Sequence, residues 1–276
     1  MNMQMLSYID RPTTIHRMTG AAKLICFLLW SAICMTTYDT WVLLIMLVTG
    51  LIAFKVSQIK MREVSFVLSF ILVFLLLNDL AIYGFSPGQG VQIYGTKHVI
   101  LQLPGRYSLT LEQLFYELNI TLKYFSVIPF ALLFIVTTRP SEFAASLNRI
   151  GVSYRIAFAV SITLRYIPDI QRNYREIAQA QQARGIDLSK KENLRKRIKH
   201  AAAIVVPLIF SSLDRIETIS NGMELRGFGK KKKRTWYSAR PFAARDFLAM
   251  GFSAALLIAS LALTLIRGSR YYNPFI

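Results

Sequence analysis

Five apolar segments dominate the sequence and decide what the chain can fold into. They lie at about 21–38, 41–56, 64–83, 113–138 and 246–266. A helix needs roughly 20 apolar residues to cross the hydrocarbon core of a bilayer. The sequence therefore predicts an all-α, polytopic membrane protein with about five transmembrane helices. The first two segments are short, so a tight helical hairpin partly embedded in the membrane is an alternative for them.

The charge distribution supports a membrane location. The chain is 54% hydrophobic and carries a net charge of +18. A soluble protein this basic would suggest a nucleic-acid partner, but about +14 of that charge, from 22 basic and 8 acidic residues, lies between residues 139 and 245. Basic residues concentrate in the cytoplasmic segments of membrane proteins. We therefore expect no nucleic acid, and a multi-pass protein of the prokaryotic inner (plasma) membrane with a cytoplasmic N-terminus.

These patterns divide the chain into four parts. An N-terminal membrane domain of about four helices covers residues 1–138, and a cytoplasmic domain of three helices covers 139–229. A basic linker follows at 230–245, and the last membrane helix with an external tail occupies 246–276. The loop at 84–110 carries no pattern that we can assign.

The cytoplasmic part is predicted to hold one short and two long helices. Apolar residues recur in it at helical spacing. The short helix is expected to begin near Ser141, whose hydroxyl can cap it, and to stop at Gly151. The long helices are expected at about 154–184 and 194–226. Pro168 and Pro207 fall inside them, and because an interior proline removes a backbone hydrogen bond, both helices are expected to kink.

Both long helices end in the same way. The first Arg-Gly end is Ala183-Arg184-Gly185, and the second is Leu225-Arg226-Gly227. One interpretation is a plain helix terminus, because glycine tolerates the left-handed conformation and a cation favours the last turn. Two such ends in one basic cytoplasmic segment favour partner docking instead, since arginine offers a planar fork of five donors.

The sequence resembles the transmembrane T component of energy-coupling factor (ECF) transporters, whose coupling helices end in paired Ala-Arg-Gly signatures. The resemblance also rests on the apolar N-terminal part, on Arg139-Pro140-Ser141-Glu142 at the entry to the short helix, and on the final membrane helix. Leu225 departs from the family pattern, which has alanine there.

The resemblance implies a non-catalytic coupling subunit of an ABC-type importer. Arg184 and Arg226 would each insert into one of two cytoplasmic ATPase subunits, identical or different. The long helices would contact a membrane-embedded substrate-binding (S) subunit for a vitamin, a metal ion or a similar micronutrient. The chain would hold no cofactor, because ATP and Mg would be bound by the partner subunits. No Gly-x-x-x-x-Gly-Lys-Ser/Thr phosphate loop is present in the sequence.

Other residues that often carry chemistry lack a functional pattern. His16, His98 and His200 are scattered without acids or cysteines at ligand spacing, so we assign no catalytic residue and no metal site. Cys26 and Cys34 are interpreted as small apolar residues. The basic run at 230–234 precedes a membrane helix and is expected to bind anionic lipids.

Three alternatives remain open. The chain could be an ordinary ABC-type permease subunit, although two Arg-Gly ends in one chain favour a subunit that meets two ATPases. It could be a membrane scaffold that recruits cytoplasmic proteins without transport. A membrane-embedded enzyme ranks last, because the apolar segments are nearly free of ionisable residues.

Overall fold

The computed structural model describes residues 11–102, 107–185, 194–231 and 235–275. The chain divides into two compact units. Unit 1 comprises Met1–Arg139 together with Arg240–Ile276, and unit 2 comprises Pro140–Ala239. Each unit is described by itself below.

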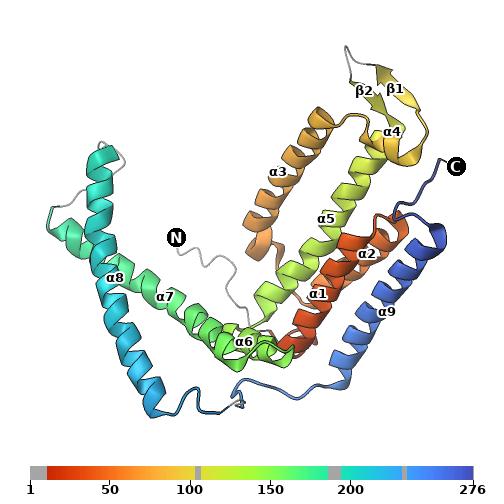
Figure 1. The fold of residues 1–276 in the computed structure, drawn as a ribbon. Helices are drawn as coiled ribbons and strands as arrows, with labels where there is room; N and C mark the ends of the chain where they lie inside the picture. The colour runs from red at the N-terminus through yellow and green to blue at the C-terminus, as the bar shows by residue number, and fades with distance from the viewer. Residues whose placement is uncertain (1–10, 103–106, 186–193, 232–234, 276) are drawn as a thin grey trace. The chain divides into compact units, whose positions relative to one another are not determined.

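Unit 1 is a helical bundle (Figure 1). The five predicted apolar segments are all helices, with ends within three residues of the expected positions, as α1 (Gly20–Thr36), α2 (Thr40–Val56), α3 (Met61–Phe85), α5 (Leu111–Thr137) and α9 (Ala244–Arg267). Three of these, α3, α5 and α9, are long and apolar enough to cross a membrane, whereas α1 and α2 have 17 residues each. The all-α membrane class is therefore confirmed.

Helix α5 is the centre of the bundle and packs against α1, α2 and α3. The indole of Trp30 stacks on Phe130 with ring centroids 4.0 Å apart, and its Nε1 donates to the Ser126 carbonyl at 3.1 Å. Gly50 of α2 faces Pro129 and Phe130 of α5, and a Cβ built at Gly50 would lie 3.4 Å from both residues. Cys34 belongs to the same buried cluster and, like Cys26, is a free thiol, which confirms the interpretation of both as small apolar residues.

Polar side chains also join α5 to the neighbouring helices. The Ser126 hydroxyl donates to the Leu43 carbonyl of α2 at 2.9 Å, and the Thr40 hydroxyl donates to the Asn119 side chain at 2.7 Å. Near the other end of α5, the Lys23 ammonium donates to the Thr137 carbonyl at 2.7 Å. Such bonds fix the register of helices that apolar packing alone would leave free to slide.

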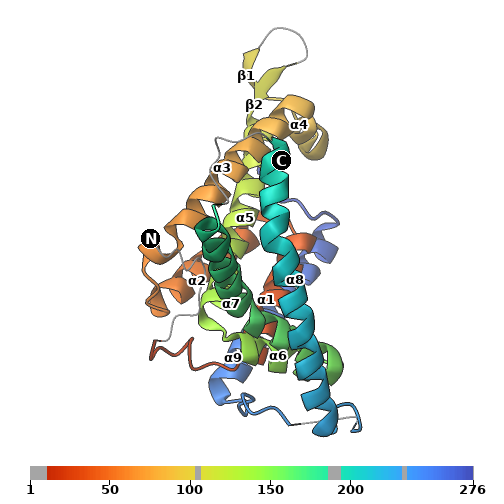
Figure 2. The same ribbon diagram turned by 90° about the vertical axis from the view of Figure 1, so that its left-hand side faces the viewer.

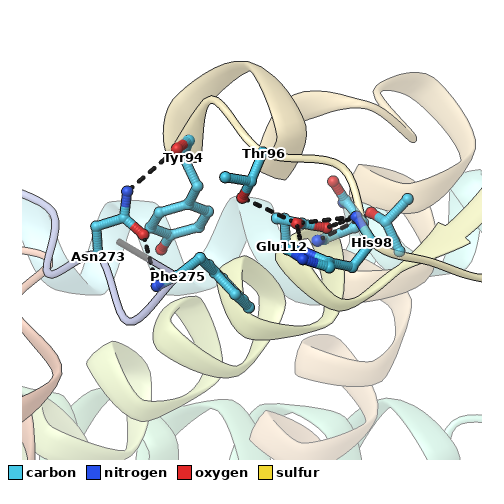
Figure 3. A network of polar contacts seen from close by, with 8 residues as sticks. Tyr94, Thr96, His98, Glu112, Asn273 and Phe275 are labelled. Atoms are coloured by element: carbon cyan, nitrogen blue, oxygen red, sulfur yellow. Dashed lines mark hydrogen bonds and ion pairs between the residues drawn. The ribbon is translucent and has the colours of Figure 1, made fainter.

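The loop that the sequence left unassigned is structured where it is described. It holds the short helix α4 (Gln89–Tyr94) and two antiparallel strands, β1 (Val99–Gln102) and β2 (Ser108–Thr110). The buried Glu112 carboxylate accepts from the backbone N–H of His98 at 3.0 Å, pairs with its ring at 2.6 Å, and accepts from the Thr96 hydroxyl at 2.9 Å (Figure 3). The C-terminal tail joins this region through Asn273, which donates to the Tyr94 carbonyl at 3.1 Å.

We predict that Glu112→Gln destabilises unit 1, because it weakens the shared acceptor of three donors. Leaving buried donors poorly paired costs about 1–3 kcal/mol, so the thermal unfolding midpoint of the purified protein should fall by several degrees. Glu117→Gln is the matched control, since Glu117 accepts one described bond, from the Gln113 side chain. Equal midpoints for the two variants would contradict a structural role for the Glu112 carboxylate.

Unit 2 contains α6 (Pro140–Arg149), α7 (Tyr154–Ala183) and α8 (Leu194–Leu225). The expectation that Ser141 caps α6 is wrong, because the helix already begins at Pro140. Proline suits the first helical position, where its missing N–H is not needed and its φ is preset. The predicted stop is correct: Gly151 has a φ of 108°, and the Val152 N–H bonds back to the Leu147 carbonyl at 3.0 Å.

Candidate partner-docking site

Both Arg-Gly ends have a glycine in the left-handed conformation. The φ of Gly185 is 85° and that of Gly227 is 63°. At the second end, the Gly227 N–H bonds to the Glu224 carbonyl at 2.8 Å and the Phe228 N–H bonds to the Met223 carbonyl at 2.9 Å. This pattern closes a helix and turns the chain sharply. The local sequence therefore ends each of the two long helices, here called rods, at a defined point, and an arginine directly follows the last helical residue.

The side chains at these ends are turned outward. Ala183, Arg184 and Gly185 are exposed, as are Leu225 and Arg226, while Gly227 is half-buried. Within the described residues, the Arg184 guanidinium has no hydrogen bond or ion pair. Leu225 is 90% exposed, an unusual position for a leucine in the last turn of a helix. Both ends thus present a cation at a surface that a partner could cover.

The two ends differ in how they are anchored. The chain that follows the second end folds back onto the start of α7, where Phe228 packs on Phe158 and Tyr154 at centroid distances of 4.7 and 5.5 Å. Arg155 donates to the Gly229 carbonyl at 3.1 Å. Trp236 continues this contact by donating to the Asn148 side chain of α6 at 3.1 Å. The second end is therefore braced against its own unit. After the first end, residues 186–193 lie outside the described chain.

The two rods also contact each other near the point where α7 and α8 cross in Figure 1. Arg215 of α8 lies 3.4 Å from the Asp169 carboxylate and 5.6 Å from the Tyr166 ring centroid of α7. Near the first Arg-Gly end, Gln181 donates to the Ala203 carbonyl of α8 at 3.1 Å. Pro168 and Pro207 lie inside α7 and α8. Each rod is one continuous helix (Figure 2), so kinking at the prolines stays a prediction.

Helix α8 carries an apolar stripe that unit 2 does not cover. Its members lie on one side of the helix and each is at least 44% exposed. They are Ile198, Val205, Val206, Ile209, Phe210, Leu213 and Ile216. The only described residue of α8 that is buried is Ile204, at 2% exposure. We call the seven exposed residues, from Ile198 to Ile216, the α8 stripe. A contiguous exposed apolar surface of this kind marks a protein or membrane contact.

Sequence reasoning located both Arg-Gly ends but missed the residues that brace the second one. Phe228 and Trp236 stand in a glycine-rich and basic stretch, where no periodic pattern marks them as packed. The basic run at 230–234 was expected to bind lipid, and three of its residues, 232–234, lie outside the described chain. In the described part, no group of three or more His, Cys, Asp or Glu side chains is placed to hold a metal ion.

We predict that Phe228→Ala loosens the second Arg-Gly end while leaving its arginine in place. Truncating this half-buried ring should cost about 1–3 kcal/mol, less than the 3–5 kcal/mol typical of a fully buried phenylalanine. Limited proteolysis should then cut the chain after α8 several-fold faster. Phe242→Ala, in unit 1, serves as the control. An unchanged cleavage rate would show that the aromatic contact does not hold this end.

A membrane bundle joined to a unit of two long, largely uncovered helices is the architecture of a membrane component within a larger assembly. Comparison with known proteins shows which family this membrane component belongs to. The CbiQ family of cobalt transport proteins matches residues 12–237, so the chain belongs to this family and is a transmembrane component of an ECF-type ABC transporter, as the sequence resemblance predicted. It is the membrane component of such a transporter and not its ATP-hydrolysing component.

Individual relatives agree with this assignment. An energy-coupling factor transporter transmembrane protein EcfT from Lactococcus lactis is 30% identical, over 90% of this chain and 92% of that protein. The corresponding protein of Bacillus selenitireducens is 26% identical, over 91% of this chain and 94% of that protein. A putative ABC transporter ATP-binding protein of Bifidobacterium longum is 33% identical over 48% of this chain and 17% of that protein. The partners of the chain are accordingly ABC ATPases.

Proposed function

We propose that the chain couples two cytoplasmic ABC ATPase subunits to a membrane-embedded substrate-binding subunit, and so drives uptake of a vitamin, a metal ion or a similar micronutrient. The observation that carries the proposal is the pair of exposed Arg-Gly ends on two rods that contact each other. Each end would dock into one ATPase, with Arg184 or Arg226 as the charged anchor. ATP and Mg would be bound by those ATPases, and this chain would supply neither a nucleotide site nor a catalytic group.

The proposed coupling depends on movement that passes from one long helix to the other through the contacts between them. Because α7 and α8 are joined by Asp169–Arg215 and Gln181–Ala203, displacement of one docked end is transmitted to the other rod. Pro168 and Pro207 would provide the points of flexure. A change of this kind works as a switch if the crossing has two discrete arrangements that ATP binding and hydrolysis favour in turn.

The α8 stripe is the proposed contact for the substrate-binding subunit. Its members are aliphatic or aromatic and lie on one side of a helix whose opposite side supplies Ile204 to unit 2. An apolar partner surface would bury the stripe without leaving polar groups unpaired. The same proposal places the chain in the prokaryotic plasma membrane as a multi-pass protein, with the N-terminus and the Arg-Gly ends on the cytoplasmic side and the basic linker near anionic headgroups.

Replacing the anchoring arginines tests the docking role. Arg184→Ala and Arg226→Ala should each weaken ATPase binding by about tenfold to a hundredfold, since a charged hydrogen bond contributes about 1.5–3 kcal/mol. The double variant should lose uptake more fully than either single variant, at unchanged membrane insertion. Affinity purification with quantified ATPase, together with uptake in reconstituted vesicles, measures both effects. Arg172→Ala, which removes an exposed arginine within α7, is the matched control.

The outcomes distinguish the candidate functions. Co-purification of two ATPase polypeptides, or two copies of one, with a small hydrophobic membrane protein supports the coupling role. ATPases without such a membrane protein favour an ordinary permease, and the absence of both favours a scaffold. Full uptake by the Arg184→Ala/Arg226→Ala protein would exclude docking through these ends.

Leu225 gives a test specific to the second end. Because its side chain is 90% exposed beside Arg226, we expect an ATPase to cover it. Leu225→Ala should then weaken ATPase binding by about tenfold through lost apolar burial, while helix content stays constant. Leu213→Ala is the control, since it changes another exposed leucine of α8 that lies away from the Arg-Gly end. Equal or tighter ATPase binding by Leu225→Ala would contradict this contact.

A further inference from the structure

Unit 1 contains a cavity of about 240 Å³ between four of its helices. The cavity opens at the side of the bundle, where Phe252 of α9 is 48% exposed. Its wall is almost wholly apolar, apart from the ammonium of Lys23 and a few hydroxyl and thiol groups. It is formed by Ile15, Met18, Lys23, Cys26, Trp30, Thr49, Ala53, Phe130, Leu133, Phe134, Thr137, Ala249, Phe252 and Ser253.

Leaving this cavity empty or filling it with water would each be energetically unfavourable. An apolar cavity of about 150 Å³ in another protein stays dry and binds benzene, and this cavity is larger. An empty space of this size would forfeit the dispersion contacts of every side chain that lines it. Ordered water would need two to four polar partners, whereas the Lys23 ammonium is already bonded to the Thr137 carbonyl at 2.7 Å. The occupant should therefore be apolar, and around a membrane helix the available apolar groups are lipid acyl chains.

Arg245 lies near one end of the cavity, next to the backbone of Arg17. Arg245 lies one helical turn before the lining residue Ala249, and its Nη2 donates at 2.6 Å to the carbonyl of Arg17, the neighbour of the lining residue Met18. The Nε of Arg245 is buried and has no hydrogen-bond partner in the described part of the chain. A buried guanidinium N–H without a hydrogen-bond partner lowers the stability of the fold. A ligand that supplies a hydrogen-bond acceptor at this end of the cavity would therefore be favoured.

Among the described residues, no carboxylate supplies that acceptor. The nearest acid in sequence, Asp246, accepts instead from the backbone N–H groups of Thr19 at 3.1 Å and Ala243 at 2.9 Å. Within the described residues, neither Arg17 nor Arg245 forms an ion pair with a carboxylate. The cavity thus combines an apolar interior with the cationic residues Arg245 and Arg17 near one end, which is the charge complement of an anionic amphiphile.

We propose that the cavity binds one acyl chain of an anionic phospholipid, whose phosphate is held by Arg245 and Arg17. The phosphate oxygens would accept from the Arg245 guanidinium, and the chain would lie along Phe130 and Phe252, with Trp30 stacked on Phe130. This site differs from a general lipid anchor in the basic run at 230–234, because it recognises both the tail and the headgroup of a single molecule.

Trp30 provides a direct reporter, since it lines the cavity and is only 1% exposed. The full chain with Trp41→Phe and Trp236→Phe keeps Trp30 as its single indole, because the sequence has three tryptophans. This protein is placed in phosphatidylcholine nanodiscs that contain a minor, equal fraction of brominated phosphatidylglycerol or brominated phosphatidylcholine. Bromine quenches an indole that it contacts. We expect Trp30 to be quenched by both lipids, with about tenfold enrichment of phosphatidylglycerol.

Two pairs of variants separate tail from headgroup recognition. Ala53→Leu fills the cavity and should lower quenching by both lipids, while Ala255→Leu, on an exposed part of α9, should not. Arg17→Gln/Arg245→Gln should abolish the preference for phosphatidylglycerol. Lys230→Gln/Lys231→Gln removes the same charge from the linker and should keep that preference. Absence of Trp30 quenching, equal quenching by both lipids, or equal loss of preference in the two double variants would each overturn the proposal.

If the single-tryptophan variant fails to fold, native mass spectrometry of the unsubstituted protein tests the same proposal by detecting bound phospholipid. One anionic phospholipid per chain should survive detergent exchange, and Arg17→Gln/Arg245→Gln should lose it. Release of all phospholipid from the unsubstituted protein under these conditions would overturn the proposal.

Discussion

The hydrogen bonds and close contacts of helix α5 hold the membrane unit together. Helices in a bilayer gain little from the hydrophobic effect when they associate, because lipid is as apolar as their own side chains. Specific contacts must then select one arrangement, and α5 provides them through Ser126, Asn119 and the stacking of Phe130 on Trp30. The same crowded centre leaves a space where small residues meet, at Cys26, Ala53 and Ala249, and that space is the cavity proposed to hold a lipid chain.

Unit 2 differs from unit 1 in that its long helices are packed against little else in the chain. Helices α7 and α8 have 30 and 32 residues, yet the described part of α8 buries a single residue, Ile204. In proteins, most of the stability of a helix comes from packing of its apolar face rather than from intrinsic propensity. The exposed apolar faces of the two rods are therefore expected to pack against partner proteins. The second Arg-Gly end has its own brace in Phe228 and Trp236, so the two ends of the proposed coupler are not mechanically equivalent.

The sequence predicted those features that depend on local pattern. Apolar length located the five helices of unit 1 within three residues, and the glycines at 151, 185 and 227 marked helix ends that do have a positive φ. Ser141 is not the N-cap of α6, because the preceding Pro140 occupies the first helical position. The preference of proline for that position outweighed the preference of serine for the N-cap. The region around Glu112 could not be predicted, since its order depends on His98 and Thr96 approaching from a separate segment. Phe228 was missed for the same reason, because nothing near it in sequence reveals its partners on α7.

Arginine serves two different purposes in this chain, and its surroundings distinguish them. At Arg184 and Arg226 the side chains are exposed at the ends of rods, where an acceptor of a partner protein can reach the guanidinium. At Arg245 part of the guanidinium is already buried without an acceptor, so the cost of removing it from water has been incurred during folding. An exposed arginine adds to the specificity of a reversible contact. A partly buried arginine with one N–H left without an acceptor favours a ligand that stays bound, which is the behaviour expected of a structural lipid.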